Sequence, residues 1–529
     1  MRTTSTIAIL ALITLLATPA PAQIKFTPIA LSGQPAPGVP GAVYHYFDDA
    51  SLNTAGQIAF TARTALPQAP QTATGLWTGS PGSLQLLAHT GFPSPSIEGA
   101  TLQGIGSPQI DPAGSVLFHT YCTLPGKAFY GSWAGFPGAL EGIGLPSTPA
   151  PDPVGGTFDW TYVSSRSPSA QITFTSCITK QLPDDTTEYI YAAFLRSRPG
   201  AYQLIARSGD HVSGTSSTTL IGPSLFHTGY VIEPPAVNAA QQMAFSVNLN
   251  GPDVESSNDR ALVLAANGSL QLIARSGDPA PTPGFPVRYD GFGAPELTNT
   301  GLLVFTGTLQ TPDSYVPTEP ALFAGHPGDI QALAFPGMDV PGISGARFSR
   351  VNDFRATPDG RITFYASMAG DNIDYSNDGS LWISSDDQLR LIARDGDVVP
   401  GTDALHLRIG RWFVNDSGQL VFGASLSNQD LTTFDSAIFT TDPAGNLVLI
   451  ARAGDPLDLG DGAPRTIQYL TPFDFSNTGQ LAMTVTFSDG STGLFIATVP
   501  EPATPIALAL ISLAMLRPSR AHRLQEKHP

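Results

Sequence analysis

One pattern recurs through this 529-residue sequence and limits the folds that it can adopt. The pattern is a turn of the form Asn-x-x-Gly with phenylalanine, or methionine in the last copy, four residues after the glycine. Successive copies of that last position are 58, 56, 71, 60, 59, 58 and 61 residues apart, so one unit is used eight times. The copies are Asn53/Gly56/Phe60, Asp111/Gly114/Phe118, Ser167/Ala170/Phe174, Asn238/Gln241/Phe245, Thr298/Gly301/Phe305, Thr357/Gly360/Phe364, Asn415/Gly418/Phe422 and Ser476/Gly479/Met483.

Each unit has the periodicity of β-strands. After the turn, the second and fourth residues are large and apolar, as in Ile58 and Phe60, and the residue between them is small or apolar, so the strand should be covered on both faces. A loop, a short apolar strand and a tight turn such as Asn267-Gly268 follow. A strand related to Leu-Ile-Ala-Arg then ends in Gly-Asp, and a further strand leads into the next copy. The pattern predicts four strands per unit and no amphipathic helix.

Eight four-stranded units of about 60 residues predict an all-β fold, an eight-bladed β-propeller. The last unit stops before its Leu-Ile-Ala-Arg strand, and residues 26–38 at the other end match the strand and loop that are missing. We therefore expect the N-terminal strand to complete the last blade and close the ring. The alternative, an open solenoid such as a β-helix, would not need this complementarity.

The N-terminus has the features of a secretory signal peptide. Arg2 precedes an apolar run from Ile7 to Leu16, and Ala20-Pro21-Ala22 is a cleavage site of the A-x-A type. The mature chain should begin near Gln23, outside the cytoplasm. The expected organisation is a signal peptide (1–22), an eight-repeat propeller (23–499) and a C-terminal tail (500–529).

The tail places Val499-Pro500-Glu501-Pro502 before an apolar run from Ala503 to Leu516 and a basic end. This order resembles the PEP-CTERM sorting signal of Gram-negative surface proteins, with Pro500, Glu501 and Pro502 as the motif. The resemblance implies an exosortase-type sorting enzyme as partner, a tail that is transiently in the membrane, and delivery to the cell surface or the extracellular space. The alternative is an ordinary short membrane anchor, although 14 apolar residues are fewer than the ~20 that span a bilayer.

The repeats, over about residues 26–498, resemble bacterial surface proteins with tandem Asn-x-x-Gly-x-x-x-Phe motifs and varied C-terminal anchors, the choice-of-anchor family. The resemblance implies a surface location, and the family has no established activity that could be carried over to this chain. Two copies carry Ala170 and Gln241 at the glycine position, which leaves the type of those turns open.

The charge of the chain bears on its partners. Without the signal peptide and the residues after Pro502, 21 basic and 42 acidic residues remain, a formal charge of about −21. Such a charge disfavours nucleic acid and anionic lipid and favours cations or basic surfaces. Many acids fall in the loops after the repeat phenylalanine, which should share one rim. That rim is either a solvated, aggregation-resistant surface or a docking face for Ca²⁺ or a basic partner.

One of these loops resembles a calcium loop, because oxygen-bearing side chains alternate along it before a glycine. Asp374, Ser376 and Asp378 are the candidate Ca²⁺ ligands. Position twelve is Ser385 and not glutamate, so an ordinary polar hairpin is the alternative. No other cofactor is indicated.

Cys122 and Cys177 are the only cysteines, which suits an exported protein with at most one disulfide. Both follow repeat phenylalanines, so they can lie on neighbouring units. A disulfide and two separate buried thiols are both compatible with the sequence.

No motif for catalysis is present: the sequence lacks His-Glu-x-x-His, Gly-x-Ser-x-Gly and a Cys/His cluster. We infer no catalysis and expect a binding or structural module of the cell envelope or extracellular matrix, with a polysaccharide or a basic surface protein as partner. The alternative is a polysaccharide-active hydrolase or lyase on a propeller scaffold. Carboxylates with an aromatic platform in the central channel would favour the enzyme, and a channel of small and apolar residues would favour the scaffold.

Overall fold

The computed structural model describes residues 24–66, 69–166, 171–222, 231–233, 235–311, 319–385, 388–399, 406–428, 434–442, 445–460 and 462–499. The expected signal peptide and the tail, with Pro500, Glu501 and Pro502, lie outside the described residues.

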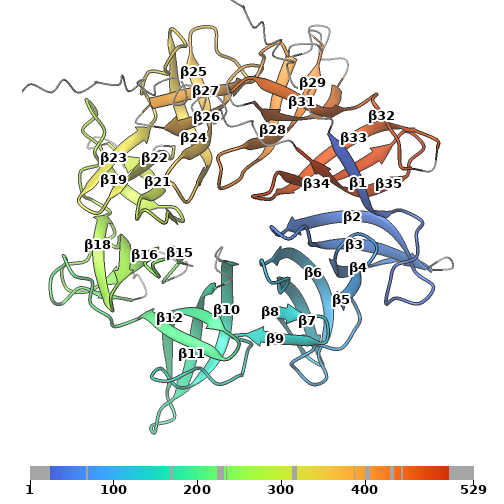
Figure 1. Ribbon diagram of the computed structural model, residues 1–529. Helices are drawn as coiled ribbons and strands as arrows, with labels where there is room; N and C mark the ends of the chain where they lie inside the picture. Colours follow the sequence, from blue (N-terminus) through green and yellow to red (C-terminus); the bar gives the residue numbers. More distant parts are fainter. Residues whose placement is uncertain are drawn as a thin grey trace, which may run out of the picture.

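Eight antiparallel sheets form a ring, and within the described residues all regular secondary structure is β (Figure 1). Blades 1 to 3 are β2 (Val43–Leu52), β3 (Ile58–Leu66), β4 (Ala69–Gly79), β5 (Gln85–His89); β6 (Thr101–Ile110), β7 (Val116–Leu124), β8 (Lys127–Phe136), β9 (Ala139–Ile143); and β10 (Thr157–Arg166), β11 (Ile172–Gln181), β12 (Thr187–Arg198), β13 (Ala201–Arg207). Blades 4 and 5 are β14 (Leu220–Ile221), β15 (Ala236–Val237), β16 (Met243–Asn250), β17 (Arg260–Ala266), β18 (Ser269–Arg275); and β19 (Arg288–Phe292), β20 (Glu296–Leu297), β21 (Leu303–Gln310), β22 (Ala321–His326), β23 (Asp329–Ala334). Blades 6 to 8 are β24 (Ala346–Ala356), β25 (Ile362–Gly370), β26 (Gly379–Ser385), β27 (Gln388–Arg394); β28 (His406–Val414), β29 (Leu420–Ser427), β30 (Phe434–Thr441), β31 (Leu447–Arg452); and β32 (Pro456–Leu457), β33 (Arg465–Phe475), β34 (Gln480–Phe487), β35 (Thr492–Thr498) with β1 (Lys25–Leu31). The prediction of an eight-bladed β-propeller is confirmed.

The repeat phenylalanines form the core of the blades. Phe60 and its counterparts, including Met483, are fully buried, and the neighbouring position on the opposite face of each strand is at most 1% exposed. Both faces of the strand are therefore covered, as predicted. In six blades this phenylalanine stacks on an aromatic ring of the next strand, for example Phe60 on Trp77 at 5.8 Å between centroids.

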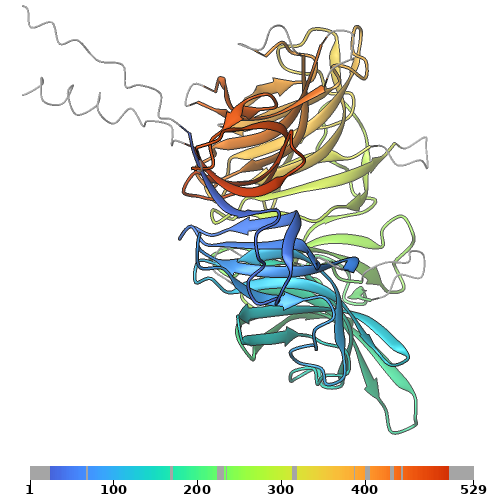
Figure 2. The same cartoon turned by 90° about the vertical axis from the view of Figure 1, so that its right-hand side faces the viewer.

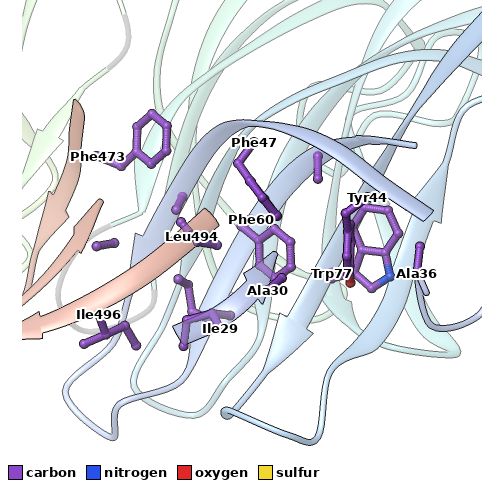
Figure 3. Packing of buried hydrophobic residues seen from close by; sticks show 14 of the residues in the cluster. Ile29, Ala30, Ala36, Tyr44, Phe47, Phe60, Trp77, Phe473, Leu494 and Ile496 are labelled. Carbon is purple, nitrogen blue, oxygen red and sulfur yellow. The ribbon is translucent and has the colours of Figure 1, made fainter. Parts of the chain in front are cut away.

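The ring closes between the two ends of the chain. β1 pairs with β35 in antiparallel register, with Lys25 opposite Thr498, so β35 has a neighbour on both sides (Figures 1 and 2). Ile29 forms the same β-bulge as the second residue of the Leu-Ile-Ala-Arg strands, such as Ile273. Figure 3 shows β1 packing into one core with the last blade and blade 1. The prediction that the N-terminal strand completes the last blade is confirmed.

Neighbouring blades are joined by a repeated backbone contact. The glycine after each Leu-Ile-Ala-Arg strand donates its N–H to a carbonyl of the next inner strand, as from Gly277 to Tyr289 (2.7 Å), and Tyr289 donates back to Asp278 (3.0 Å). The same two bonds occur at all eight junctions, and at one of them Ser147 replaces the glycine with a positive φ of 65°. The Gly-Asp sequence therefore builds the junction, as a positive φ favours glycine.

The Asn-x-x-Gly turns form a second link on the opposite face of the ring. The Asn53 side-chain oxygen accepts backbone N–H groups of Ala55 (3.0 Å) and Gln57 (2.9 Å). Its amide nitrogen donates to the carbonyl of Asp111 in the next blade (2.9 Å). Gln241, which replaces the turn glycine, takes a φ of 59°, so that copy keeps the turn; Ala170 lies outside the described residues.

Candidate functional site in the central channel

A cavity of about 790 Å³ lies in the centre of the ring, on the side of the Asn-x-x-Gly turns. Inner strands of blades 1, 2, 6, 7 and 8 line it, together with Tyr365 of β25, so it spans the junction where the ring closes. The cavity has the volume of a small-molecule site, and its wall is mixed polar and aromatic. Its main polar and aromatic lining residues are Asp49, Ser51, Ser107, Gln109, Asp353, Arg355, Tyr365, Arg411, Trp412 and Asp474.

β-Bulges place three aspartates on this wall. In β2, β24 and β33 the pairing register shifts by one residue, and Asp49, Asp353 and Asp474 are the residues that follow the extra one. Each carboxylate accepts the backbone N–H of its own next residue, at 3.0, 2.9 and 2.8 Å respectively. The aspartates therefore satisfy donors that the bulges release from the sheet.

Both carboxylate oxygens of Asp474 accept backbone N–H groups. Its second oxygen accepts the backbone N–H of Leu52 in blade 1 (2.7 Å). Glu296 makes the equivalent contact to the N–H of Ala356 (2.6 Å) at the junction of blades 5 and 6. Burial raises the pKa of both carboxyl groups, and these backbone donors act in the opposite direction. Asp474 is therefore a link between blades.

Asp49 has a free oxygen. The Asp49 carboxylate accepts the N–H of Ala50, and it forms no other hydrogen bond or ion pair with the residues that the structure describes. Burial raises the pKa of this carboxyl group, while the charge of Arg411 across the pocket lowers it to a smaller extent. Asp49 can accept a hydrogen bond from a ligand or, when protonated, donate one.

The two arginines of the pocket differ in their contacts. The Arg355 guanidinium pairs with Asp353 (2.9 Å) and Glu296 (3.8 Å), and it lies over the Trp412 ring, 6.0 Å from its centroid. Arg411 is exposed to the channel and forms no hydrogen bond or ion pair with the part of the chain that is described. One guanidinium is thus neutralised and the other is available.

A bulge also presents Arg411. Ile409 pairs with Ala424 and Trp412 with Phe422, so Gly410 and Arg411 together oppose a single residue of β29. A Cβ on Gly410 would lie 3.0 Å from the carbonyl oxygen of Gly423, so the close approach favours glycine at this position. Gly-Arg-Trp is the sequence of this bulge, and all three of its residues line the cavity.

The predicted Ca²⁺ loop lies elsewhere, between β25 and β26 on the face of the ring opposite the Asn-x-x-Gly turns. The Asp374 carboxylate accepts the hydroxyl (2.6 Å) and backbone N–H (2.8 Å) of Ser376, and these hydrogen bonds lower its pKa. Within the described residues, no three His, Cys, Asp or Glu side chains converge on a metal position. Asp378 makes no side-chain hydrogen bond with the described residues, and Ca²⁺ binding by the three residues stays a prediction.

Cys122 and Cys177 are two free, buried thiols, on β7 of blade 2 and β11 of blade 3. Burial raises the pKa of each thiol to about 11. Of the two alternatives that the sequence left open, the structure has the separate thiols.

Sequence reasoning missed the channel residues. Asp49, Asp353, Arg411 and Trp412 lie in inner strands whose bulges change which side chains face the channel, and a strict two-residue period assigns them wrongly. A signal did exist, because an acid stands four residues before the turn residue at Asp49 and Asp353, and two residues before it at Glu296 and Asp474.

Comparison with solved structures finds other propellers at low similarity. The chain is similar to the β-propeller domain of the Trilobed protease from Pyrococcus furiosus (10% identity, 78% of this chain and 100% of that chain, TM-score 0.40) and to the Dos1 propeller (9%, 89% and 94%, 0.41). It is also similar to a polysaccharide lyase, an ulvan lyase (8%, 91% and 98%, 0.32). Such values carry no argument about function.

The fold and the pocket define the class: an eight-bladed β-propeller with a polar and aromatic site in its channel. Residues 65–506, more than four fifths of the chain, match the family described as "Family of unknown function (DUF7453)", and the chain belongs to that family. No curated protein sequence matches it significantly. In the described part of the chain, no helix has the length and hydropathy to span a bilayer.

Proposed function

We propose that this protein is an exported β-propeller that binds a saccharide of the cell envelope or extracellular matrix in its central pocket. The observation that carries the proposal is the wall of that pocket, where Arg411, Asp49 and the Trp412 ring lie around one cavity of about 790 Å³. A channel lined by small and apolar residues would have favoured a purely structural module.

The wall suits a sugar because sugars present hydroxyl groups along their edges and apolar C–H groups on their faces. The free oxygen of Asp49 accepts from hydroxyls, and the Arg411 guanidinium donates to ring and hydroxyl oxygens. Arg355 lies over the Trp412 ring, and the remaining surface of this half-buried indole would contact the apolar face of a sugar.

Export and surface anchoring rest on the two ends of the sequence. The run from Ile7 to Leu16 before Ala20-Pro21-Ala22 supports a signal peptide, and Pro500-Glu501-Pro502 before an apolar run supports sorting by an exosortase. Because Lys25 pairs with Thr498, the segments leading to both ends start from the same blade. The acidic loops after the repeat phenylalanines would provide a second binding surface. Its occupant would be Ca²⁺, held by Asp374, Ser376 and Asp378, or a basic protein.

Isothermal titration of the purified protein with neutral and acidic oligosaccharides tests the proposal. Saturable binding should be weakened at least tenfold by Trp412→Ala. Tyr130→Ala is the matched control, because this tyrosine is 75% exposed on β8 outside the pocket, and binding should be unchanged. Absence of binding to any saccharide, or binding that Trp412→Ala leaves intact, contradicts the proposal.

A second candidate is cleavage of the bound polysaccharide, which Asp49 favours. A carboxyl group with a raised pKa and an unbonded oxygen, in a cavity also lined by Trp412, has the properties of a general acid. Release of new reducing ends from a bound polysaccharide, abolished by Asp49→Asn with binding retained, would support it. Binding without any cleavage product leaves the protein a binding module.

A further inference from the structure

We infer that the saccharide bound in the central pocket carries a carboxylate, as a uronic acid does, and that Arg411 is the residue that selects it. This inference rests on the function proposed above and names the ligand class of the same site. The charged groups around the cavity differ in whether they already have a partner among the described residues.

The positive groups of the pocket are not equivalent. Nη1 of Arg355 contacts Asp353, Glu296 and the carbonyl of Phe354 (2.6 Å), so two carboxylates already compensate its charge. Arg411 has no hydrogen-bond partner among the described residues, although it is exposed in a cavity where Arg355, Asp353 and Asp474 are all engaged. A guanidinium has five donors in a rigid fork that fits the two oxygens of a carboxylate.

The negative groups around the cavity leave room for an incoming anion. Backbone N–H groups and Arg355 compensate Asp353, and backbone N–H groups on two blades compensate Asp474. Asp49 is the one pocket carboxylate that faces Arg411 without a direct bond to it, and its burial disfavours the ionised form. A ligand carboxylate on Arg411 would add a charge-assisted hydrogen bond that no described group supplies.

The position of Arg411 next to Trp412 supports recognition of a sugar acid over a free anion. The two residues are consecutive in β28, after the bulge at Gly410, and both line the cavity. Arg355 lies over the indole, 6.0 Å from its centroid, so we expect a sugar acid in the cavity to contact the rest of the Trp412 side chain together with the Arg411 guanidinium. A small inorganic anion could satisfy Arg411 and would gain nothing from Trp412.

The excess of acidic residues acts over a longer range than this contact. The formal charge of the protein is −17, so the protein repels an anionic polysaccharide at a distance. Salt screens that repulsion over about 8 Å at physiological ionic strength. The contact to Arg411 lies within that length. The pocket should therefore prefer short stretches of uronic acid to highly charged polymers.

The test is calorimetric titration of the full protein with matched trisaccharides. Trigalacturonate, trimannuronate and cellotriouronate are compared with their neutral counterparts, and a sulfated trisaccharide is included. At least one uronate should bind about tenfold or more tightly than its neutral counterpart. Arg411→Gln should remove this preference while binding of the neutral sugar persists, and Arg411→Lys should restore part of it.

The control variant is Arg347→Gln, because Arg347 is exposed and pairs with Asp339 away from the pocket. It should change neither affinity. Equal affinity for uronate and neutral sugar, or a preference for the sulfated sugar, overturns the inference and leaves the proposed function standing. Binding of none of these sugars overturns the inference, and absence of binding to the neutral and acidic oligosaccharides of the first titration as well overturns the proposed function itself. A preference for uronate that survives Arg411→Gln overturns the role of Arg411.

Discussion

Asn53 links blades 1 and 2 through its side chain, and its removal should destabilise the ring. The residue is 4% exposed, and its carboxamide makes four hydrogen bonds: two accepted from turn N–H groups, one to Gln57 and one to the carbonyl of Asp111. Asn53→Ala removes all four of these hydrogen bonds. Each buried unpaired group costs about 1–3 kcal/mol, and water reaches the exposed part of the turn, so we expect a loss of about 2 kcal/mol.

Two variants separate the turn from the link. Asn53→Ser keeps the acceptor, as Ser476 does naturally when it accepts the N–H of Gln480 (3.1 Å), but loses the donor to the next blade. It should cost about 1 kcal/mol. Asn415→Ala should cost less than Asn53→Ala, because the Asn415 amide lies 3.5 Å from the Ser476 carbonyl, against 2.9 Å for Asn53.

The assay is guanidinium unfolding followed by tryptophan fluorescence, with midpoints compared at equal slope. Thr54→Ala is the control, because Thr54 is exposed in the same turn. If Asn53→Ala unfolds within about 0.5 kcal/mol of Thr54→Ala, the turn asparagine does not hold the blades together and the reasoning is refuted.

Three further predictions concern the core, a buried acid and the thiols. Gly75→Ala should destabilise the protein by about 1–3 kcal/mol, because the added Cβ would lie 2.3 Å from the ring of Trp77. Gly106→Ala should change the stability little, because the space around Gly106 is open. Equal effects of the two variants in guanidinium unfolding would contradict this prediction. Burial raises the pKa of Asp395, so the charged form of this residue destabilises the fold as the pH rises through that pKa. Asp395→Asn should therefore be more stable than the native protein at about pH 7 and lose this advantage near pH 4. An equal advantage at both pH values would contradict this prediction. Titration with a thiol reagent and no reductant should detect no thiol in the native protein and both after denaturation, and fewer than two after denaturation would indicate a disulfide.

The sequence was sufficient to predict the architecture, because the relevant signals are local and repeated eight times. The turn residue at Asn53, the buried Phe60 and the orphan strand around Ile29 each have one role, and the structure assigns them that role. Gln241 in a left-handed conformation shows that the fold can hold a turn whose local preference is weaker.

The pocket could not be predicted, because it depends on contacts between units far apart in the sequence. Asp49 and Arg411 are more than 360 residues apart, and the closure of the ring by β1 brings their blades together. The bulges that expose Arg411 follow from pairing register, which sequence period alone does not determine. The state of Cys122 and Cys177 also depends on how two blades lie in space, because their spacing in the sequence fits both a disulfide and two thiols.

The first structure to determine is a crystal structure of the protein with a bound uronic acid oligosaccharide. We expect the sugar in the central cavity, with one ring against Trp412 and its carboxylate within hydrogen-bond distance of the Arg411 guanidinium. An empty channel with the oligosaccharide near the loop of Asp374 would contradict this expectation.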